Sequence, residues 1–112
     1  MYKISEVAVL LNISISTLRY YDKKGLLPFI KKDEHGYRIF NEHDLEMIQL
    51  IICLKETKMP LEKIRLFIDL EKNKKQEKFQ LLTEHKKSVE QQLEIIIEGL
   101  ARINNKLELF AP

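Results

Sequence analysis

Side chains that donate hydrogen bonds to anions are concentrated between residues 14 and 28. Thr17 and Tyr20 carry O–H donors there, and Arg19 carries a planar guanidinium. A guanidinium binds a carboxylate or a phosphate through two parallel hydrogen bonds. The chain as a whole has no nucleophile–base pairing, no paired-carboxylate pattern and no phosphate-cradling glycine loop. We therefore expect a surface that binds an anionic partner, and we expect no enzyme.

The same stretch predicts a short helix with both ends marked. The Ser14 hydroxyl can accept an orphan backbone N–H at the N-terminus. Gly25 stands where a left-handed residue closes a helix, and Pro28 prevents a restart. Apart from Leu18, the helix has few apolar residues, so it needs a scaffold behind it.

Charge and composition narrow the class of protein. The chain has 112 residues and a net charge of only +2, which allows one domain, or one small domain plus an extension. Residues 15–40 nevertheless hold six basic and three acidic side chains. No run approaches the ~18 apolar residues of a membrane span, no signal peptide is recognisable, and the single cysteine excludes an internal disulfide. These features predict a cytoplasmic protein.

A second short helix is predicted just before the first, at residues 5–11. Apolar residues from Ile4 to Leu11 recur there at helical spacing. A three-residue connection, 12–14, joins the two helices, and the second helix is polar on its outer face. This pattern predicts a helix-turn-helix. The alternative is an ordinary helical hairpin within a larger core.

A small β-hairpin is predicted after the helix-turn-helix. Residues 29–32 and 37–40 are short β-like runs, and Gly36 can take the positive φ that the loop between them needs. A hairpin in this position is a wing, and Tyr37 and Arg38 at its base can reach a phosphate backbone. The alternative is a solvated hairpin that only covers the core.

Two further helices are predicted to complete the core. Asn41 caps the third, with Asp44 three residues on, and this helix runs to about Thr57. Pro60 suits the first position of the fourth helix. The fourth helix has a buried stripe of Leu61, Ile64, Phe67 and Ile68.

The chain ends with a predicted helix over residues 76–109, roughly 50 Å long. Apolar side chains alternate at spacings of three and four along it, which is a heptad pattern. This apolar stripe consists of Phe79, Leu82, Val89, Leu93, Ile96, Leu100, Ile103, Leu107 and Phe110, with one polar break at Lys86. So long a helix cannot bury its stripe on so small a core, so we expect a homodimer. Leucine at one heptad position and isoleucine or valine at the other disfavour a parallel two-stranded pair. Ile95 and Ile97 widen the stripe, so we expect an antiparallel pair in which these isoleucines pack on the globular part of the partner.

Three segments carry a family resemblance: TLRYYDKKGLLP, GYRIFNEHDLEMIQLI and MPLEKIRLF. Together they resemble the MerR family of bacterial transcriptional regulators over the N-terminal two-thirds of the chain. The resemblance implies a mainly α fold, with a winged helix-turn-helix DNA-binding domain and a long antiparallel coiled-coil dimerisation helix. We expect these at residues 1–71 and 76–112, with a linker at 72–75. It also implies that a homodimer binds a two-fold-symmetric promoter operator, distorts the spacer DNA and realigns the promoter for RNA polymerase.

The resemblance extends to individual DNA-binding positions. Four residues match the recognition helix, two match the wing, one precedes the fourth helix, and two more share the polar surface of the recognition helix. In chain order the candidates are Ser16, Thr17, Arg19, Tyr20, Tyr21, Lys24, Tyr37, Arg38 and Lys58. Tyr21 has an alternative role, packing its ring against Leu18 and the wing.

The signal that the protein responds to is the least determined feature. The chain stops at Pro112, so we expect no separate effector domain, and one cysteine with three unclustered histidines predicts no metal and no cofactor. A subset of short family members with one cysteine in the third helix responds to aldehydes or other thiol-reactive electrophiles, so the resemblance suggests Cys53 as a sensor. Lys55 and Lys58 would favour its thiolate. The alternative is that Cys53 is a plain core residue.

Two other functions compete with a promoter regulator. One is an excisionase-like architectural protein that bends DNA, although such proteins generally lack a long dimerisation helix. The other is a coiled-coil adaptor whose basic N-terminal patch is incidental. Phosphate contacts give DNA binding a steep salt dependence, which separates the adaptor from the DNA-binding readings.

Overall fold

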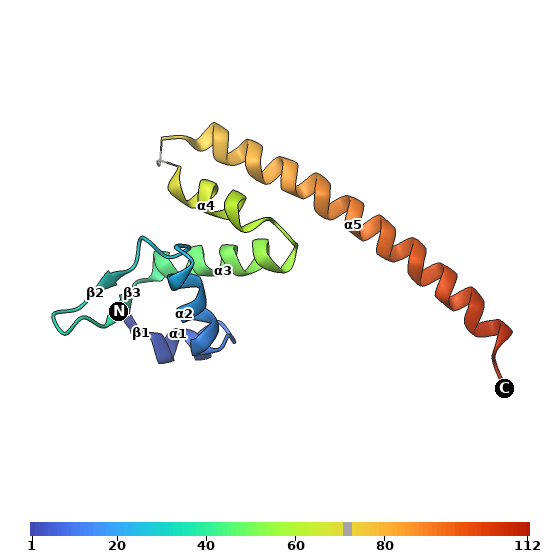
Figure 1. Ribbon diagram of the computed structural model, residues 1–112, viewed down its shortest axis with the longest axis horizontal. Helices are drawn as coiled ribbons and strands as arrows, with labels where there is room; N and C mark the ends of the chain where they lie inside the picture. Colours follow the sequence, from blue (N-terminus) through green and yellow to red (C-terminus); the bar gives the residue numbers. More distant parts are fainter. Residues whose placement is uncertain (71–72) are drawn as a thin grey trace. The chain divides into compact units, whose positions relative to one another are not determined.

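A computed structural model describes residues 1–70 and 73–112 of the chain. The elements follow in the order β1, α1, α2, β2, β3, α3, α4, α5 (Figure 1). They form two compact units, Met1–Asp69 and Leu70–Pro112. The predicted boundary between residues 71 and 72 lies outside the described residues. Helix α5 already begins at Lys75, inside the predicted linker.

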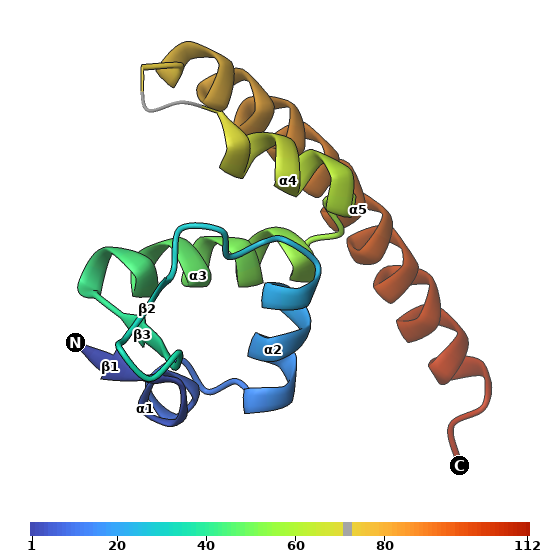
Figure 2. The ribbon, with the colours of Figure 1, turned by 60° about the vertical axis from the view of Figure 1, so that its left-hand side comes forward.

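The predicted helix-turn-helix is confirmed. Helix α1 spans Ile4–Leu10 and helix α2 spans Ile15–Lys23, and a short connection joins them (Figure 2). Helix α1 begins and ends one residue earlier than predicted. The Ser14 hydroxyl accepts from the Thr17 backbone N–H at 3.0 Å, so the predicted N-cap of α2 is also correct.

Three helices end in the same way. Shortly after each helix, one residue has a positive φ angle. This residue is Asn12 after α1 (+52°), Gly25 after α2 (+76°) and Lys58 (+70°) after α3, which spans Glu42–Glu56. After each one, the next residue donates its backbone N–H to a carbonyl in the preceding helix: Ile13 to Ala8, Leu26 to Tyr21 and Met59 to Leu54. This is the Schellman motif. The left-handed Gly25 was predicted, whereas the left-handed Asn12 and Lys58 were not.

The wing belongs to a three-stranded antiparallel sheet with the order β1-β3-β2. Strand β2 spans Lys31–Lys32 and β3 spans Arg38–Phe40, so both are shorter than the predicted runs. The third strand, β1 at Tyr2–Lys3, was not predicted, because two residues have no periodicity. It pairs Tyr2 with Phe40 and Lys3 with Ile39, and thereby connects the N-terminus to the wing.

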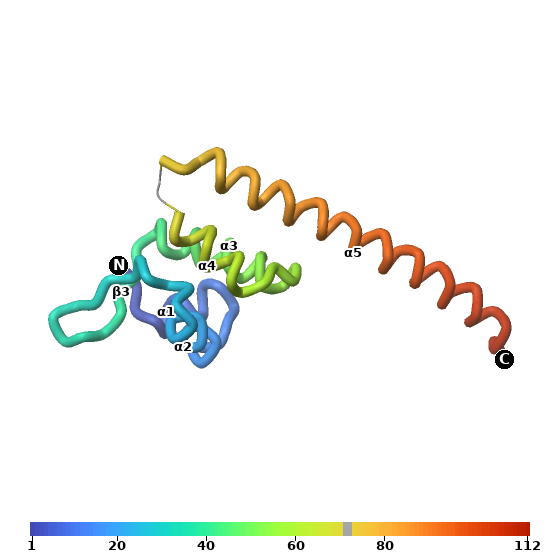
Figure 3. Tube along the Cα trace, turned by 45° about the horizontal axis from the view of Figure 1, so that its top comes forward, coloured from blue at the N-terminus to red at the C-terminus, as the bar shows by residue number. Residues whose placement is uncertain are grey.

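The wing loop projects from the helices of its unit (Figure 3). Asp33 organises it, because its Oδ1 accepts the backbone N–H groups of His35 and Tyr37, both at 2.9 Å. Gly36 has a φ of +84°, as the loop was predicted to need. The wing tip therefore has an ordered backbone, although its side chains are exposed.

The core of the first unit lies between these elements and helices α3 and α4 (Leu61–Asp69). Asn41 and Asp44 form a reciprocal cap at the start of α3, with bonds of 2.8 and 2.9 Å. The side chains that are almost fully buried are Val7, Leu18, Leu26, Leu27, Phe40, Ile48, Ile51 and Ile64. Each described element from α1 to α4, apart from β2, contributes a buried side chain, so α3 and α4 do complete the core as predicted.

Helix α5 spans Lys75–Leu109 and none of its residues is buried. The members of the apolar stripe from Leu93 to Phe110 are all exposed, as is Phe79. A 35-residue helix with such a face is not stabilised by its own unit. None of the described helices combines the length and the apolar character that a bilayer-spanning segment needs.

Candidate nucleic-acid interface

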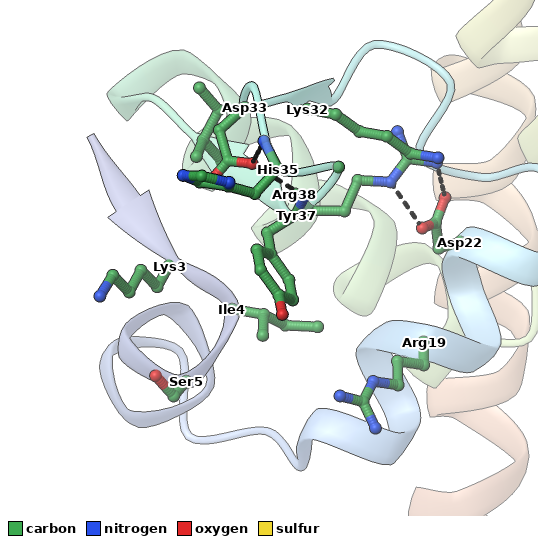
Figure 4. A pocket seen from close by; sticks show the side chains of 12 residues that line it. Lys3, Ile4, Ser5, Arg19, Asp22, Lys32, Asp33, His35, Tyr37 and Arg38 are labelled. Atoms are coloured by element: carbon green, nitrogen blue, oxygen red, sulfur yellow. Dashed lines mark hydrogen bonds and ion pairs between the residues drawn. The ribbon is translucent and has the colours of Figure 1, made fainter.

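A cavity of ≈ 750 Å³ lies between the recognition helix α2, the wing and the N-terminal strand (Figure 4). Arg19 and Asp22 line it from α2, and Tyr37 points into it from the wing towards Ile4 (Figure 4). Its other lining residues are Lys3, Ser5, Lys32, Asp33, His35, Gly36, Arg38 and Ile39. Three of the predicted DNA-binding residues therefore line this cavity, which we call the hollow. They are Arg19, Tyr37 and Arg38.

The charges in this cavity are not equally available. Asp22 is paired with Arg38, and Asp33 accepts backbone N–H groups of the loop. In the described part of the chain, the side chains of Lys3, Arg19 and Lys32 make no hydrogen bond and no ion pair. Three cations thus remain open to an incoming anion.

Arg38 makes three hydrogen bonds inside the protein. Its Nε and Nη2 donate to the two carboxylate oxygens of Asp22 at 2.9 and 3.0 Å, and its Nη1 donates to the Ile30 carbonyl at 2.8 Å. The predicted contact between Arg38 and DNA stays a prediction, and the guanidinium has an intramolecular role that the sequence did not indicate.

The tyrosines of α2 differ in environment. Tyr20 is 45% exposed, and the Lys24 Nζ lies 5.7 Å from the centre of its ring. Tyr21 is only 7% exposed, and burial raises the pKa of its phenol, with a smaller effect from Glu56. Tyr20 can therefore offer its ring and hydroxyl to a partner, whereas Tyr21 packs in the core, the alternative role considered from its position.

The remaining candidates lie on the exposed surface of the first unit. Ser16 is exposed at the first turn of α2. The Thr17 hydroxyl, which is partly buried, is 2.7 Å from the Ser14 hydroxyl. Lys58 is exposed, and its left-handed backbone turns the chain between α3 and α4. None of these three lines the cavity described above.

Sequence reasoning missed two of the cavity's cations as site residues. Lys32 was counted only within the local excess of basic residues, because a lysine beside a loop has no distinctive spacing. Lys3 reaches the cavity because β1 pairs with β3. That pairing joins residues that lie far apart in the sequence, so no local pattern could reveal it.

Cys53 is exposed on α3, so the alternative that it is a plain core residue does not hold for the single chain. Within residues 1–70 and 73–112, no group of three or more histidine, cysteine, aspartate or glutamate side chains is arranged to hold a metal ion.

Comparison with known sequences identifies relatives. The model of the MerR HTH family regulatory protein matches residues 2–71. An uncharacterised HTH-type transcriptional regulator of Haemophilus influenzae is 44% identical over 68 residues, which are 61% of this chain and 50% of that protein. The regulator ZntR of Escherichia coli is 30% identical over 112 residues, covering 94% of this chain and 79% of ZntR. The chain spans about half the length of several curated relatives that it matches.

Solved structures agree with this assignment. A MerR-family transcriptional regulator from Bacillus thuringiensis has a TM-score of 0.89 and 37% identity, with 96% of both chains covered. HiNmlR, a MerR-family regulator lacking the sensor domain and bound to promoter DNA, has a TM-score of 0.87 and 34% identity, with 97% of this chain and 89% of HiNmlR covered. With its winged helix-turn-helix and long terminal helix, this chain belongs to the MerR family of helix-turn-helix transcriptional regulators, which are not enzymes.

Proposed function

We propose that two copies of this chain bind one promoter operator with two-fold symmetry. The observation that carries the proposal is the hollow between α2 and the wing, where Lys3, Arg19 and Lys32 have no intramolecular partner among the described residues. Three uncompensated cations attract a phosphate backbone and release its counterions. The promoter DNA bound to HiNmlR supports the same partner for this chain.

The candidate DNA-binding side chains have distinct parts in this proposal. Arg19 grips a guanine edge or a phosphate through its forked N–H groups. The hydroxyls of Thr17, Tyr20 and Tyr37 donate to phosphate oxygens, which sets the position of the protein without reading the sequence. Ser16, Lys24 and Lys58 extend the contact along the backbone.

The second copy docks along α5. The exposed apolar stripe on this helix is a face of the kind that a second identical helix covers, and its leucine and isoleucine positions disfavour a parallel two-stranded pair. The proposed pair is therefore antiparallel. A two-fold dimer presents two recognition helices to two half-sites, whose spacing is one turn of DNA or a multiple of it. The operator is therefore a palindrome.

Contacts by two wings and two recognition helices also provide the means to distort the spacer DNA. Bending or untwisting a site of this size costs on the order of several kcal/mol, so many phosphate contacts must offset it. We propose that the distorted spacer realigns the two promoter elements for RNA polymerase on the same DNA.

Selection of bound duplexes from a random pool tests the proposal. The full chain is expected to recover a palindrome, and log Kd for that duplex is expected to rise with log salt by about 0.9 for each phosphate contacted. Recovery of no common sequence, together with a flat salt dependence, would refute it and would favour the coiled-coil adaptor.

Arg19→Ala measures the central contact. We expect a loss of about 1–3 kcal/mol in affinity for the selected duplex. If Arg19 reads a guanine, specificity relaxes at one base pair. If it binds a phosphate, the salt slope falls by about 1. Lys63→Ala removes an exposed positive charge on α4, outside the hollow, and serves as the control. Equal affinities of Arg19→Ala and Lys63→Ala would contradict the role of Arg19.

Cys53 is proposed as the sensor of electrophiles. Its exposure supports access by a small reagent, and Lys55 and Lys58 follow in the same sequence. With an aldehyde, the thiolate sulfur bonds to the carbonyl carbon, the π electron pair moves to oxygen, and that oxygen takes a proton. Cys53→Ser is expected to bind the operator normally but to lose the transcriptional response. An aldehyde response that persists in Cys53→Ser would remove Cys53 as the sensor.

A further inference from the structure

One guanidinium joins three parts of the DNA-binding unit. Arg38 on β3 binds both carboxylate oxygens of Asp22 on α2 (Figure 4). It donates a third bond to the carbonyl of Ile30, which precedes β2. A two-pronged pair of this kind is stronger and more directional than a single hydrogen bond. The two side chains are about equally shielded, with 30% and 29% of their surfaces exposed, so they form more than a fully solvated surface pair.

Apart from the pairing of β1 with β3, few contacts fix the orientation of the wing on α2. Strand β2 pairs with β3 through only two residue pairs, Lys31 with Ile39 and Lys32 with Arg38. Hairpins this short are marginal without packing or further links. Ile30 and Phe40 anchor the base of the wing in the core, but the loop from Glu34 to Tyr37 is exposed. The Arg38–Asp22 pair is therefore the polar link that sets the angle between the wing and α2.

The pairing with Asp22 also limits the number of N–H donors that Arg38 can offer to a DNA phosphate. Three of its five N–H donors are already used. One N–H on Nη1 and one on Nη2 remain for a phosphate, and the Nε–Nη2 edge of the guanidinium is occupied by Asp22. At the same time, Asp22 places a negative charge in a hollow that otherwise attracts phosphate, and that charge by itself weakens DNA binding.

We infer that Asp22 is a positioning residue for DNA binding: it holds Arg38, and so holds the wing at the angle to α2 that lets both contact one duplex. The inference rests on the proposed DNA-binding function. Arg38 then acts mainly as the wing's brace, and the phosphate contacts of the wing come from Tyr37 and Lys32.

The direction in which Asp22→Asn changes DNA affinity separates the two possible roles of Arg38. One role is a brace that orients the wing, and the other is a direct contact with phosphate. Asp22→Asn removes a negative charge from the DNA-facing hollow, so electrostatics alone predicts tighter binding of the selected duplex. A brace predicts the opposite, a Kd raised on the order of tenfold, because the wing loses its phosphate contacts. Glu34→Gln is the matched control. It removes the same charge from the exposed wing loop, where the Glu34 carboxylate lies 3.6 Å from the His35 Nε2 and accepts no side-chain hydrogen bond among the described residues. Glu34→Gln is expected to bind at least as tightly as the wild type.

A double-mutant cycle with Arg38→Gln adds a second criterion. Residues that act through one link are coupled, so Asp22→Asn, Arg38→Gln and the double variant should raise Kd by similar factors. If Arg38 binds phosphate directly, Arg38→Gln weakens binding while Asp22→Asn strengthens it or leaves it unchanged. That pattern would overturn the inference. Recovery of affinity by the exchanged pair, Asp22→Arg with Arg38→Asp, would support it.

Hydrogen exchange on the free protein provides a readout independent of DNA. The Asp33 backbone N–H donates to the Tyr37 carbonyl across the wing, and its protection should fall in Asp22→Asn while amides in α1 keep theirs. Unchanged protection of the Asp33 amide in Asp22→Asn would overturn the inference, and so would an unchanged Kd for the selected duplex. If Asp22→Asn does not fold, Arg38→Lys replaces it, since lysine keeps the charge for a phosphate but loses the two-pronged link. A wild-type chain that binds no duplex would instead refute the proposed function, and the exchange result would still test the brace.

Discussion

Lys58 adopts a left-handed backbone conformation, with φ at +70°, in a motif where glycine is the usual residue. A side chain with a Cβ is strained there by about 1–2 kcal/mol. Its position between α3 and α4 was predicted to contact a phosphate of the operator. Strained backbone positions cluster at functional sites, which supports the predicted phosphate contact of Lys58.

Replacing Lys58 by glycine should separate stability from function. We expect Lys58→Gly to stabilise the fold by about 0.5–1 kcal/mol in urea unfolding, because the strain is relieved. Operator affinity should fall, with a salt slope smaller by about 0.9. Lys58→Ala removes the same charge but keeps the strain, so it should lose the same affinity without gaining stability. A DNA affinity that neither variant changes would contradict a phosphate contact.

Tyr21 links the stability of the fold to high pH. Burial, and then Glu56, raises the pKa of its phenol above 10.0, so the folded chain keeps a proton that the unfolded chain has already lost. Stability from this group is fully present below pH 10.0 and is lost as the pH rises through the folded value. The free energy of unfolding should therefore decline above about pH 10, and less steeply in Tyr21→Phe. Urea unfolding at several pH values measures this, and identical pH slopes in the two proteins would refute it.

Helix α2 is held chiefly at its C-terminal end. Leu18 and Tyr21 are its only buried residues, and its polar first turn faces outward. Two arginines from distant elements bind its last turn: Arg38 through Asp22, and Arg65 of α4 through the Lys24 carbonyl at 2.8 Å. A cation at this end also complements the helix dipole. The recognition helix can thus expose most of its surface and still keep a defined orientation.

Loss of the Arg65 link should loosen α2 without unfolding the domain. Arg65→Met keeps much of the aliphatic stem and removes the donor, and we expect a cost of about 1 kcal/mol in urea unfolding. Amide protection should fall at the end of α2. Lys63→Met, on the same helix and exposed, is the control. Equal stabilities of the two variants would argue against the Arg65 link.

The two compact units of the chain differ in how many residues they bury. The first has a buried core and the hollow, and the second is one 35-residue helix with no buried residue. An apolar stripe left in water costs free energy in proportion to its area, which supports the proposal that a partner chain covers it. In the proposed dimer, oligomeric state and DNA affinity are therefore coupled.

A single charge in the stripe tests that coupling. Ile96→Lys places an ammonium in the proposed interface twice, once for each copy, where burial of an unpaired charge is costly. The variant should sediment as a monomer at micromolar concentration and lose most of its operator affinity. Asn105→Lys adds the same charge on the side of α5 away from the stripe and should remain a dimer. A dimeric Ile96→Lys would exclude this stripe as the interface.

Local chemistry was sufficient to predict most elements of the fold. The Ser14 cap, the left-handed Gly25 and the Asn41–Asp44 capping box each involve residues within a few positions of one another, so backbone geometry determines them from the sequence alone. The long helix followed from a heptad period sustained over many turns. The open Arg19 followed from its place on a helix too polar to be buried.

Only the tertiary structure decided which charges are open and which are used. Arg19 and Arg38 look equivalent in the sequence, but the fold brings Asp22 to Arg38 across 16 positions and leaves Arg19 without a partner among the described residues. The pairing of β1 with β3 likewise brings Lys3 into the hollow. Ion pairs and sheet pairs between distant residues depend on how helices and strands pack, and packing is a property of the whole core rather than of any local pattern.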